Sequence, residues 1–252
     1  MLEVDCVRRE FGGLVALDDV SCQVDTGRTT ALIGPNGAGK TTLLNIIAGA
    51  LPPTRGQVRF RGRRLDSHSP VECVRCGVAR TFQQAHIFHG MSVLENVMVG
   101  CHLRGRGSLL EAALRLPRAR REEEDIYLDA VRYLNLVGLG SMAGEEASAL
   151  PFGQQRLLAI ARALALRPAV LLLDEPAAGL NRLEKNDLAE LIGRIREMGM
   201  TTILVEHDME MVMRLADWVV VLDHGRRIAQ GTPDAVRRDR AVIAAYLGTE
   251  EE

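Results

Sequence analysis

Short apolar runs and longer amphipathic stretches alternate along the chain, and this pattern predicts most of its elements. In the N-terminal part, runs of β-branched or alternating residues bounded by Gly, Pro or Asp predict strands. These strands are expected at Leu2–Val7, Val20–Val24, Thr29–Ile33, Gln57–Phe60 and Val78–Phe82. In the last third, the runs AVLLLDE, TTILVEH and WVVVLD alternate with helical segments. Continuous apolar strands separated by helices predict an α/β fold with a largely parallel sheet, covered on both faces.

The middle of the chain has a different pattern. From about Val93 to Ala165 it is mostly helical, and the segment Gly105–Asp125 is charged enough to predict an exposed surface excursion. We therefore expect one domain over residues 1–252, in which a helical subdomain interrupts an α/β core. The expected parts are a core of residues 1–88 and 166–252 and a subdomain of about 89–165.

Composition narrows the class of protein. Of 252 residues, 47% are hydrophobic and 25% charged, which is typical of a globular domain. The net charge of −2 gives no positive field, so nucleic acid is not expected as a partner. The N-terminus lacks a secretory signal and no apolar run is long enough to span a bilayer, which predicts a cytosolic chain. A membrane role would then depend on partners.

Cysteine and histidine residues raise the question of a metal site. Cys73, Cys76, His86 and His89 are four side chains of the kind that bind zinc. Both spacings are shorter than is usual for a zinc finger, and the segment between the pairs is interpreted as a helix end, a buried strand and a polar loop. We therefore interpret Cys73 and Cys76 as small buried residues on one side of a short helix.

A phosphate-binding loop is the strongest motif in the sequence. GPNGAGKT fits G-x-x-x-x-G-K-[ST] without a mismatch, after an apolar strand and before a helical run that begins with Thr42. Glycines let the backbone N–H groups turn toward phosphate oxygens, and the helix N-terminus adds its positive end. Lys40 is expected to reach the β- and γ-phosphates, and the Thr41 hydroxyl to bind Mg²⁺. The motif residues are Gly34, Pro35, Asn36, Gly37, Ala38, Gly39, Lys40 and Thr41.

A second motif points to hydrolysis of the nucleotide. In AVLLLDEP, four apolar residues form a buried strand whose end presents Asp174, which is placed to hold Mg²⁺ through water. Glu175 follows at once, where a carboxylate can orient and polarise the water that attacks the γ-phosphate. A kinase would need an acceptor pocket, which the sequence does not indicate. The predicted substrate is ATP, with Mg²⁺ as the cofactor.

With these motifs in this order, the chain resembles ABC ATPases nearly from end to end. The resemblance implies a P-loop NTPase core with an antiparallel N-terminal β part. It implies that Gln83 contacts Mg²⁺ and the γ-phosphate and senses the membrane domain, and that His207 in VEHD contacts the γ-phosphate. Phe11 takes the place of the aromatic residue that stacks on adenine. The signature segment includes Phe152, Gly153 and Gln154, and Asn181 lies in the D-loop.

Within this family, the chain is similar to Liv-type ATP-binding subunits of branched-chain amino-acid importers. The stretches FGGLVALDDVS, ARTFQ, LLLDEPAAGLN and LVEHDM are the basis of this similarity. It implies two membrane permeases, a second ABC ATPase subunit in a heterodimer or homodimer, and a substrate-binding protein that acts indirectly. The chain would then lie peripherally on the cytoplasmic side of the inner membrane.

Two positions depart from the family pattern. The usual signature is L-S-G-G-Q, but Pro151 follows Leu150 here and has neither a hydroxyl nor an N–H group. In the family, that serine bonds the γ-phosphate held by the opposite subunit. We therefore expect the site completed by this signature to bind ATP less tightly than a serine version. Asn181 replaces the common D-loop aspartate, so it keeps a hydrogen-bonding side chain but loses the charge.

Other functions remain open at this stage. An exporter subunit is the most serious alternative, because only the Liv-like stretches argue against it. Relatives of this Liv type are also associated with amides, urea and aromatic acids as substrates. A soluble ABC protein acting on ribosomes or DNA usually has two cassettes or a long coiled-coil insertion. A P-loop kinase would lack the FGQQR helix and the switch histidine.

Overall fold

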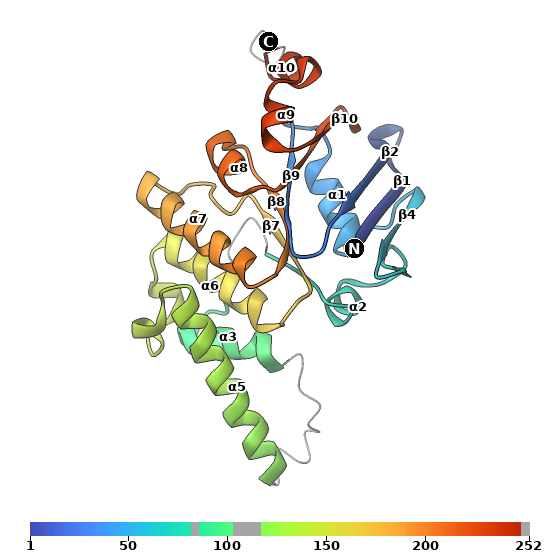
Figure 1. The fold of residues 1–252 in the computed structure, drawn as a ribbon. Coiled ribbons are helices and arrows are strands. Elements are labelled where there is room, and N and C mark those ends of the chain that lie inside the picture. Colours follow the sequence, from blue (N-terminus) through green and yellow to red (C-terminus); the bar gives the residue numbers. More distant parts are fainter. Residues whose placement is uncertain (82–85, 103–116, 248–252) are drawn as a thin grey trace. The chain divides into compact units, whose positions relative to one another are not determined.

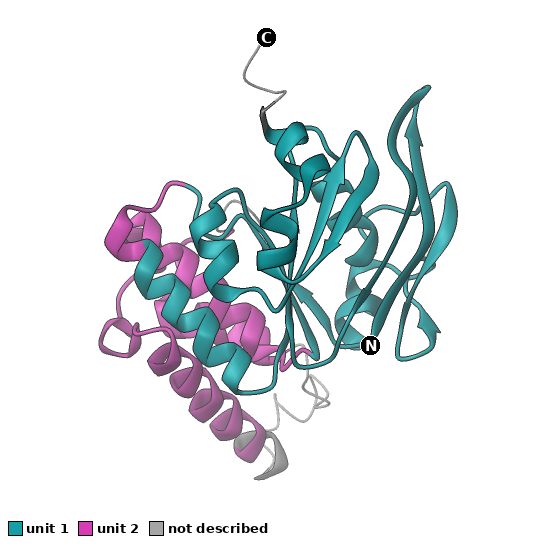
Figure 2. Ribbon diagram, turned by 45° about the horizontal axis from the view of Figure 1, so that its top comes forward, with its two compact units in different colours: residues 1–80, 169–178, 185–252 teal, residues 81–168, 179–184 magenta. Residues whose placement is uncertain are grey.

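A computed structural model describes residues 1–81, 86–102 and 117–247 (Figure 1). The chain divides into two compact units (Figure 2). The first, called the α/β unit, contains residues 1–80, 169–178 and 185–252, and the second, called the helical unit, contains residues 81–168 and 179–184. Whether both belong to one domain, as the sequence predicts, stays a prediction.

The main sheet of the α/β unit has the strand order β10-β9-β3-β8-β7-β6. All neighbouring strands are parallel except β10, which runs antiparallel to β9. The carboxyl ends of the parallel strands therefore meet at one edge of the sheet. The strands are β3 (Thr29–Ile33), β6 (Val78–Arg80), β7 (Val170–Asp174), β8 (Thr201–Val205), β9 (Trp218–Asp223) and β10 (Arg226–Gly231). A mixed, largely parallel sheet was predicted, and this is confirmed.

A second, antiparallel sheet has the order β2-β1-β4-β5 and confirms the predicted antiparallel N-terminal part. Its strands are β1 (Leu2–Phe11), β2 (Leu14–Val24), β4 (Arg55–Phe60) and β5 (Arg63–Arg64). The sequence prediction stopped β1 at Val7 and began β2 at Val20, which is too short. Gly12 and Gly13 have φ of +52° and +97° and close a two-residue hairpin turn, which lets pairing extend to its base.

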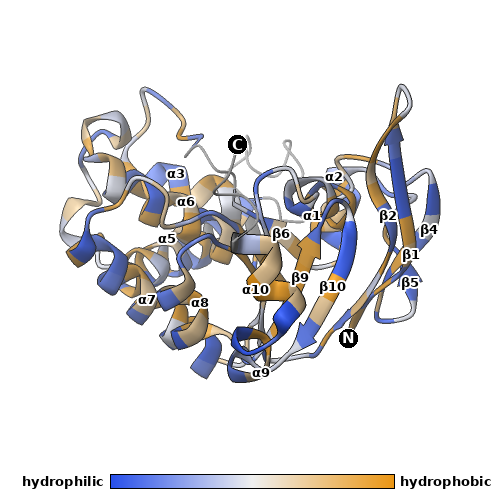
Figure 3. Ribbon diagram, turned by 90° about the horizontal axis from the view of Figure 1, so that it is seen from above, coloured by the Kyte–Doolittle hydropathy of each residue, from blue (hydrophilic) through white to orange (hydrophobic). Residues whose placement is uncertain are grey.

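The core of the α/β unit lies on both faces of the main sheet. On one face, Leu32 and Leu172 pack with the antiparallel sheet and with α1 (Lys40–Ile47). On the other, Ala31 and Ile33 pack against α8 (Met209–Leu215), α9 (Pro233–Arg237) and α10 (Arg240–Leu247). Strands buried on both faces explain why the runs in β3, β7 and β8 are continuously apolar. Figure 3 shows β9 as hydrophobic, while the outer strand β10 is largely hydrophilic.

The helical unit is built on α3 (Val93–His102), α5 (Pro117–Leu136) and α6 (Phe152–Ala165), which contact one another. A Cβ added at Gly100 of α3 would lie 2.4 Å from the Arg162 carbonyl oxygen, so glycine permits close approach of α3 and α6. Of the exposed excursion predicted for 105–125, residues 117–125 belong to α5, and residues 121–125 are mostly exposed, as expected. Its remaining residues up to 116 lie outside the described part of the chain.

The connecting elements complete the chain. A short helix α2 (Pro70–Arg75) precedes β6, and α7 (Arg182–Glu197) joins β7 to β8. Two 3₁₀ turns, Gly140–Met142 and Ala147–Ala149, lie between α5 and α6. Among the helices that the structure describes, none is long and apolar enough to cross a membrane.

Candidate functional site

The phosphate-binding loop follows β3 and has the backbone that its glycines permit. Gly34 has φ of +147°, and a Cβ there would lie 2.0 Å from the Leu222 carbonyl oxygen. Gly37 and Gly39 have φ of +79° and +98°. Gly39 is the N-cap of α1 and provides no side-chain cap, so the first N–H groups of this helix stay available for an anion.

Lys40, the first residue of α1, is almost fully buried. It is 5% exposed, and its Nζ donates hydrogen bonds to the carbonyl oxygens of Gly34 at 2.7 Å and Pro35 at 2.8 Å. Burial lowers the pKa of Lys40, while the nearby carboxylates of Glu175 and Asp174 oppose this shift. The loop therefore holds a cation close to the two acidic side chains of the second motif.

Glu175 and His207 are brought together at the carboxyl ends of β7 and β8. Oε1 of Glu175 lies 2.6 Å from Nε2 of His207. Glu175 has φ of +46°, an uncommon conformation for a residue other than glycine, and its backbone N–H donates to the Val205 carbonyl at 2.9 Å. Such backbone strain clusters at functional sites. The Glu175 side chain is 17% exposed and that of His207 is 44% exposed, so the pair can reach a ligand or water.

A buried acid that the sequence analysis missed joins the two loops that hold this pair. Glu206 is 4% exposed, and its carboxylate accepts hydrogen bonds from the backbone N–H groups of Ala177 at 2.8 Å and His207 at 3.2 Å. Burial raises the pKa of Glu206. An acid at the end of a buried strand, directly before the switch histidine, was the sequence signal for it.

Asp174 is also engaged by a residue that the sequence analysis missed. Nη2 of Arg80, at the end of β6, lies 2.7 Å from Oδ2 of Asp174. Nη1 of Arg80 donates to Oδ1 of Asn45 on α1 at 2.5 Å. The signal was a charged residue at the end of an otherwise apolar strand.

Phe11 lies at the end of β1 and is 43% exposed. The guanidinium carbon of Arg9 lies 4.6 Å from the centroid of its ring, within the range of a cation–π contact. Gln83, expected to contact Mg²⁺ and the γ-phosphate, lies outside the described residues.

The signature residues belong to the helical unit and begin α6. Phe152 is its first residue and is 52% exposed, with the Arg156 guanidinium 4.9 Å from its ring centroid. A Cβ at Gly153 would lie 2.7 Å from Oε1 of Glu184. Oε1 of Gln154 is buried and has no hydrogen-bond partner among the residues that the structure describes. Pro151 is the N-cap residue and gives α6 no side-chain cap.

The side chain of Asn181, also in the helical unit, caps the N-terminus of α7. Its Oδ1 accepts hydrogen bonds from the N–H groups of Leu183 at 2.9 Å and Glu184 at 3.1 Å. The backbone N–H of Asn181 in turn donates a hydrogen bond to the Glu184 carboxylate at 2.9 Å. Asparagine therefore forms a reciprocal capping box here, as aspartate or serine would.

Among the residues that the structure describes, no group of three or more His, Cys, Asp or Glu side chains is arranged to hold a metal ion. Cys73, Cys76, His86 and His89, which were considered above as a zinc site, are among these described residues. Cys73 is buried on α2 with its Sγ 3.8 Å from the Leu65 carbonyl oxygen, and Cys76 is partly buried at the end of that helix.

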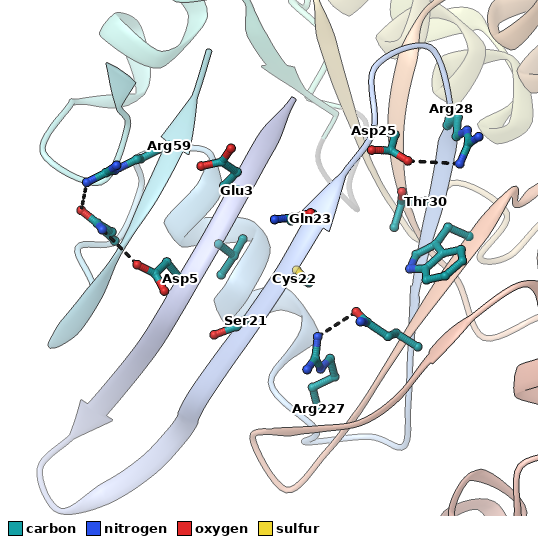
Figure 4. A pocket seen from close by; sticks show the side chains of 14 residues that line it. Glu3, Asp5, Ser21, Cys22, Gln23, Asp25, Arg28, Thr30, Arg59 and Arg227 are labelled. Atoms are coloured by element: carbon teal, nitrogen blue, oxygen red, sulfur yellow. Dashed lines mark hydrogen bonds and ion pairs between the residues drawn. The ribbon is translucent and has the colours of Figure 1, made fainter. Parts of the chain in front are cut away.

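A groove of about 530 Å³ lies between the antiparallel sheet and the strands β3, β9 and β10 (Figure 4). Several of its polar side chains bond one another: Arg28 with Asp25 at 3.1 Å, and Gln57 with Asp5 at 3.0 Å. None of the residues predicted to bind nucleotide or metal lines it. The groove is therefore separate from the predicted nucleotide site.

The chain matches two family profiles. A profile described as ABC transporter matches residues 17–178, and one described as branched-chain amino acid ATP-binding cassette transporter matches residues 226–252. Among characterised relatives, the high-affinity branched-chain amino acid transport ATP-binding protein BraF of Pseudomonas aeruginosa is 41% identical over 98% of both chains. The protein LivG of Salmonella typhimurium, described in the same words, is also 41% identical over 98% of both chains.

Solved structures of ATP-binding cassettes have the same fold. A nucleotide-free cassette from an ABC transporter superposes with a TM-score of 0.84, at 32% identity and 98% coverage of both chains. A dimeric post-hydrolysis state of the cassette MJ0796, bound to ADP and Pi, superposes with a TM-score of 0.79. Its identity is 25%, over 92% of this chain and 99% of that one.

Proposed function

The chain belongs to the ATP-binding proteins of ABC transporters, and from this premise we propose that it powers the import of branched-chain or related amino acids. It binds nucleotide and hydrolyses ATP, as the sequence resemblance implied. The observation that supports hydrolysis is the contact between Glu175 and His207 at the sheet edge that also presents Asp174. The match of residues 226–252 to a branched-chain amino acid profile supports the transported class.

Each predicted site residue of the α/β unit has a role that its position supports. The backbone N–H groups of residues 34–42, except Pro35, which has none, surround the phosphates, and Lys40 exchanges its two carbonyl partners for phosphate oxygens. Glu175 accepts a proton from the attacking water, and His207 holds Glu175 and contacts the γ-phosphate. Phe11 stacks on adenine through its exposed face.

The residues present fit Mg²⁺. In nucleotide sites this ion takes most of its ligands from phosphates and water and only one or two from protein oxygens, so a cluster of acids is not required. Thr41 is exposed in the first turn of α1, and Asp174 ends β7. We assign the ion to Thr41, to Asp174 through water, and to Gln83. When bound, Mg²⁺ neutralises charge that develops on the phosphate oxygens.

Partners complete the site and couple it to transport. We infer that Phe152, Gly153, Gln154 and Asn181 face the nucleotide held by a second ATPase subunit. A dimeric cassette among the similar structures supports this arrangement. Gln83 and the helical unit would pass the motion to two permeases, which places the chain peripherally on the cytoplasmic side of the membrane. A substrate-binding protein would act through those permeases.

The test is reconstitution. The chain is co-purified with its membrane partners, placed in proteoliposomes, and assayed for ATP-dependent uptake of labelled leucine, with urea and an aromatic acid as comparison solutes. Uptake of leucine that depends on a binding protein supports the proposal. ATP-driven efflux would indicate an exporter, and uptake of another solute alone would reject the amino-acid class. Ribosomal or DNA-repair partners would reject transport.

A further inference from the structure

Asp174 is a buried carboxylate that contacts the guanidinium of Arg80 directly, with the charge of Lys40 also nearby. Its side chain is 4% exposed, and that of Arg80, 2.7 Å away, is 9% exposed. A carboxylate removed from water is strongly destabilised as an ion unless it is paired and hydrogen-bonded. Arg80 therefore supplies a hydrogen-bonded positive charge to Asp174 at a position that water hardly reaches.

Arg80 also connects Asp174 to the helix of the phosphate-binding loop. Its second nitrogen donates to Asn45 at 2.5 Å. Asn45 follows Thr41 by one helical turn, so both side chains lie on the same face of α1. The guanidinium thus bridges the helix that contains Thr41 and the strand that ends at Asp174. Both are among the residues proposed above to hold the cation.

We propose that Arg80 is a positioning residue that acts as the resting counter-ion of Asp174 and keeps divalent cations out of the nucleotide-free site. A cation placed beside Asp174 meets the positive charge of Arg80 at close range, which disfavours binding. The triphosphate adds several negative charges to the same site and offsets this repulsion, so the cation enters together with nucleotide. This inference rests on the proposed function in that it takes Asp174 as the residue that holds the cation.

A purely structural bridge would behave differently. If Arg80 only ties α1 to β7, removing its charge lowers stability and leaves the affinity for a cation unchanged. If Arg80 is the resting counter-ion, removing its charge leaves Asp174 without the positive group that contacts it directly, and only the more distant charge of Lys40 remains nearby among the described residues. A divalent cation then replaces the lost charge and stabilises the protein.

The experiment measures Mn²⁺ binding to the purified, nucleotide-free subunit from the electron paramagnetic resonance signal of free Mn²⁺. We expect R80Q and R80M to bind Mn²⁺ at least about tenfold more tightly than wild type. A nearby charge changes the pKa of a titratable group by about one unit or more, which corresponds to a factor of about ten in the equilibrium constant. R80K, which keeps the charge, restores weak binding. Mn²⁺ raises the melting temperature of R80Q and R80M more than that of wild type.

The matched control is R167Q, which removes a guanidinium paired with Asp129 at 2.7 Å in the helical unit. It is expected to leave Mn²⁺ affinity unchanged. Unchanged affinity in R80Q and R80M overturns the proposal. So does failure of both variants to fold when Mn²⁺ is present, because the cation is expected to replace the lost charge. The assay uses neither permeases nor hydrolysis, so a negative transport result and a negative result here are distinguishable.

Discussion

The two groups of predicted site residues are built in different ways. In the α/β unit the charged side chains are already held by their own chain: Lys40 by two carbonyl groups, Asp174 by Arg80, and Glu175 by His207. In the helical unit, the ring of Phe152 is half exposed and a buried oxygen of Gln154 lacks a partner. The first group is pre-organised, whereas the second has contacts still to make.

This difference indicates which of the predicted site residues depend on assembly with partner subunits. Pre-organised charges stabilise a transition state without reorganising when it forms. Exposed aromatic residues and unpaired buried polar groups are typical of surfaces that another molecule completes. We therefore expect changes in the α/β unit to alter nucleotide chemistry in the isolated chain. Changes in the signature should alter nucleotide chemistry only after assembly.

The largest expected effect is that of E175Q. Loss of a general base should lower ATP turnover by about 10²–10⁴-fold, because the amide cannot accept the proton. Nucleotide affinity should stay near the wild-type value, since Gln keeps the size and hydrogen-bonding capacity of the side chain. Steady-state hydrolysis and nucleotide titration of the same preparations measure both. E190Q, which changes an exposed acid on α7, is the control; a normal rate in E175Q would reject Glu175 as the base.

The second-largest effect on nucleotide binding is expected from substituting a glycine of the phosphate-binding loop in the α/β unit. Two glycines of this loop differ in the space around them. G34A places a Cβ 2.0 Å from a backbone oxygen, so the loop must move and nucleotide binding should be lost. G37A meets nothing within 4 Å and should cost only about 1 kcal/mol of stability, from its positive φ. Nucleotide titration and thermal unfolding separate the two. Equal binding by both variants would mean that the loop is not pre-organised.

P151S tests the helical unit, and its effect on ATP should require assembly. A serine hydroxyl that reaches the γ-phosphate of the partner site adds a hydrogen bond to a charged group, worth about 1.5–3 kcal/mol, or roughly tenfold or more in ATP affinity. The assembled complex should therefore need less ATP for half-maximal hydrolysis.

Serine is also a good N-cap, so P151S should raise the melting temperature of the isolated chain even without nucleotide. Comparing isolated and assembled protein separates capping from phosphate contact. An unchanged ATP requirement in the complex would reject the contact.

The smallest effect is expected at Asn181. N181A removes the cap of α7 and should cost about 1 kcal/mol, which lowers the melting temperature by about 2–4 °C. N181D keeps the cap and should leave stability near wild type, while it restores the charge usual in the family. Calorimetry of the three proteins measures this. If N181A were as stable as wild type, the observed capping bonds would contribute nothing measurable.

The sequence predicted elements best where local chemistry dictates them. The strands β3, β7 and β8 were recognisable because burial on both faces forces continuous apolar runs. The hairpin of β1 and β2 was underestimated, since its outer half is polar and is paired only because Gly12 and Gly13 allow the tight turn. The charged stretch that ends at Asp125 was expected to be exposed in a mostly helical region, and residues 121–125 are mostly exposed on α5.

By itself, the sequence determined the family, the nucleotide loop and the acidic pair Asp174 and Glu175. Their chemistry depends on residues adjacent in the chain, where spacing alone specifies geometry. Only the tertiary structure decided that Arg80 neutralises Asp174 and that Glu206 ties together the loops holding Glu175 and His207. Parallel strands bring these groups to one sheet edge from distant parts of the chain. Such pairing depends on the order of strands in space, which no local pattern records.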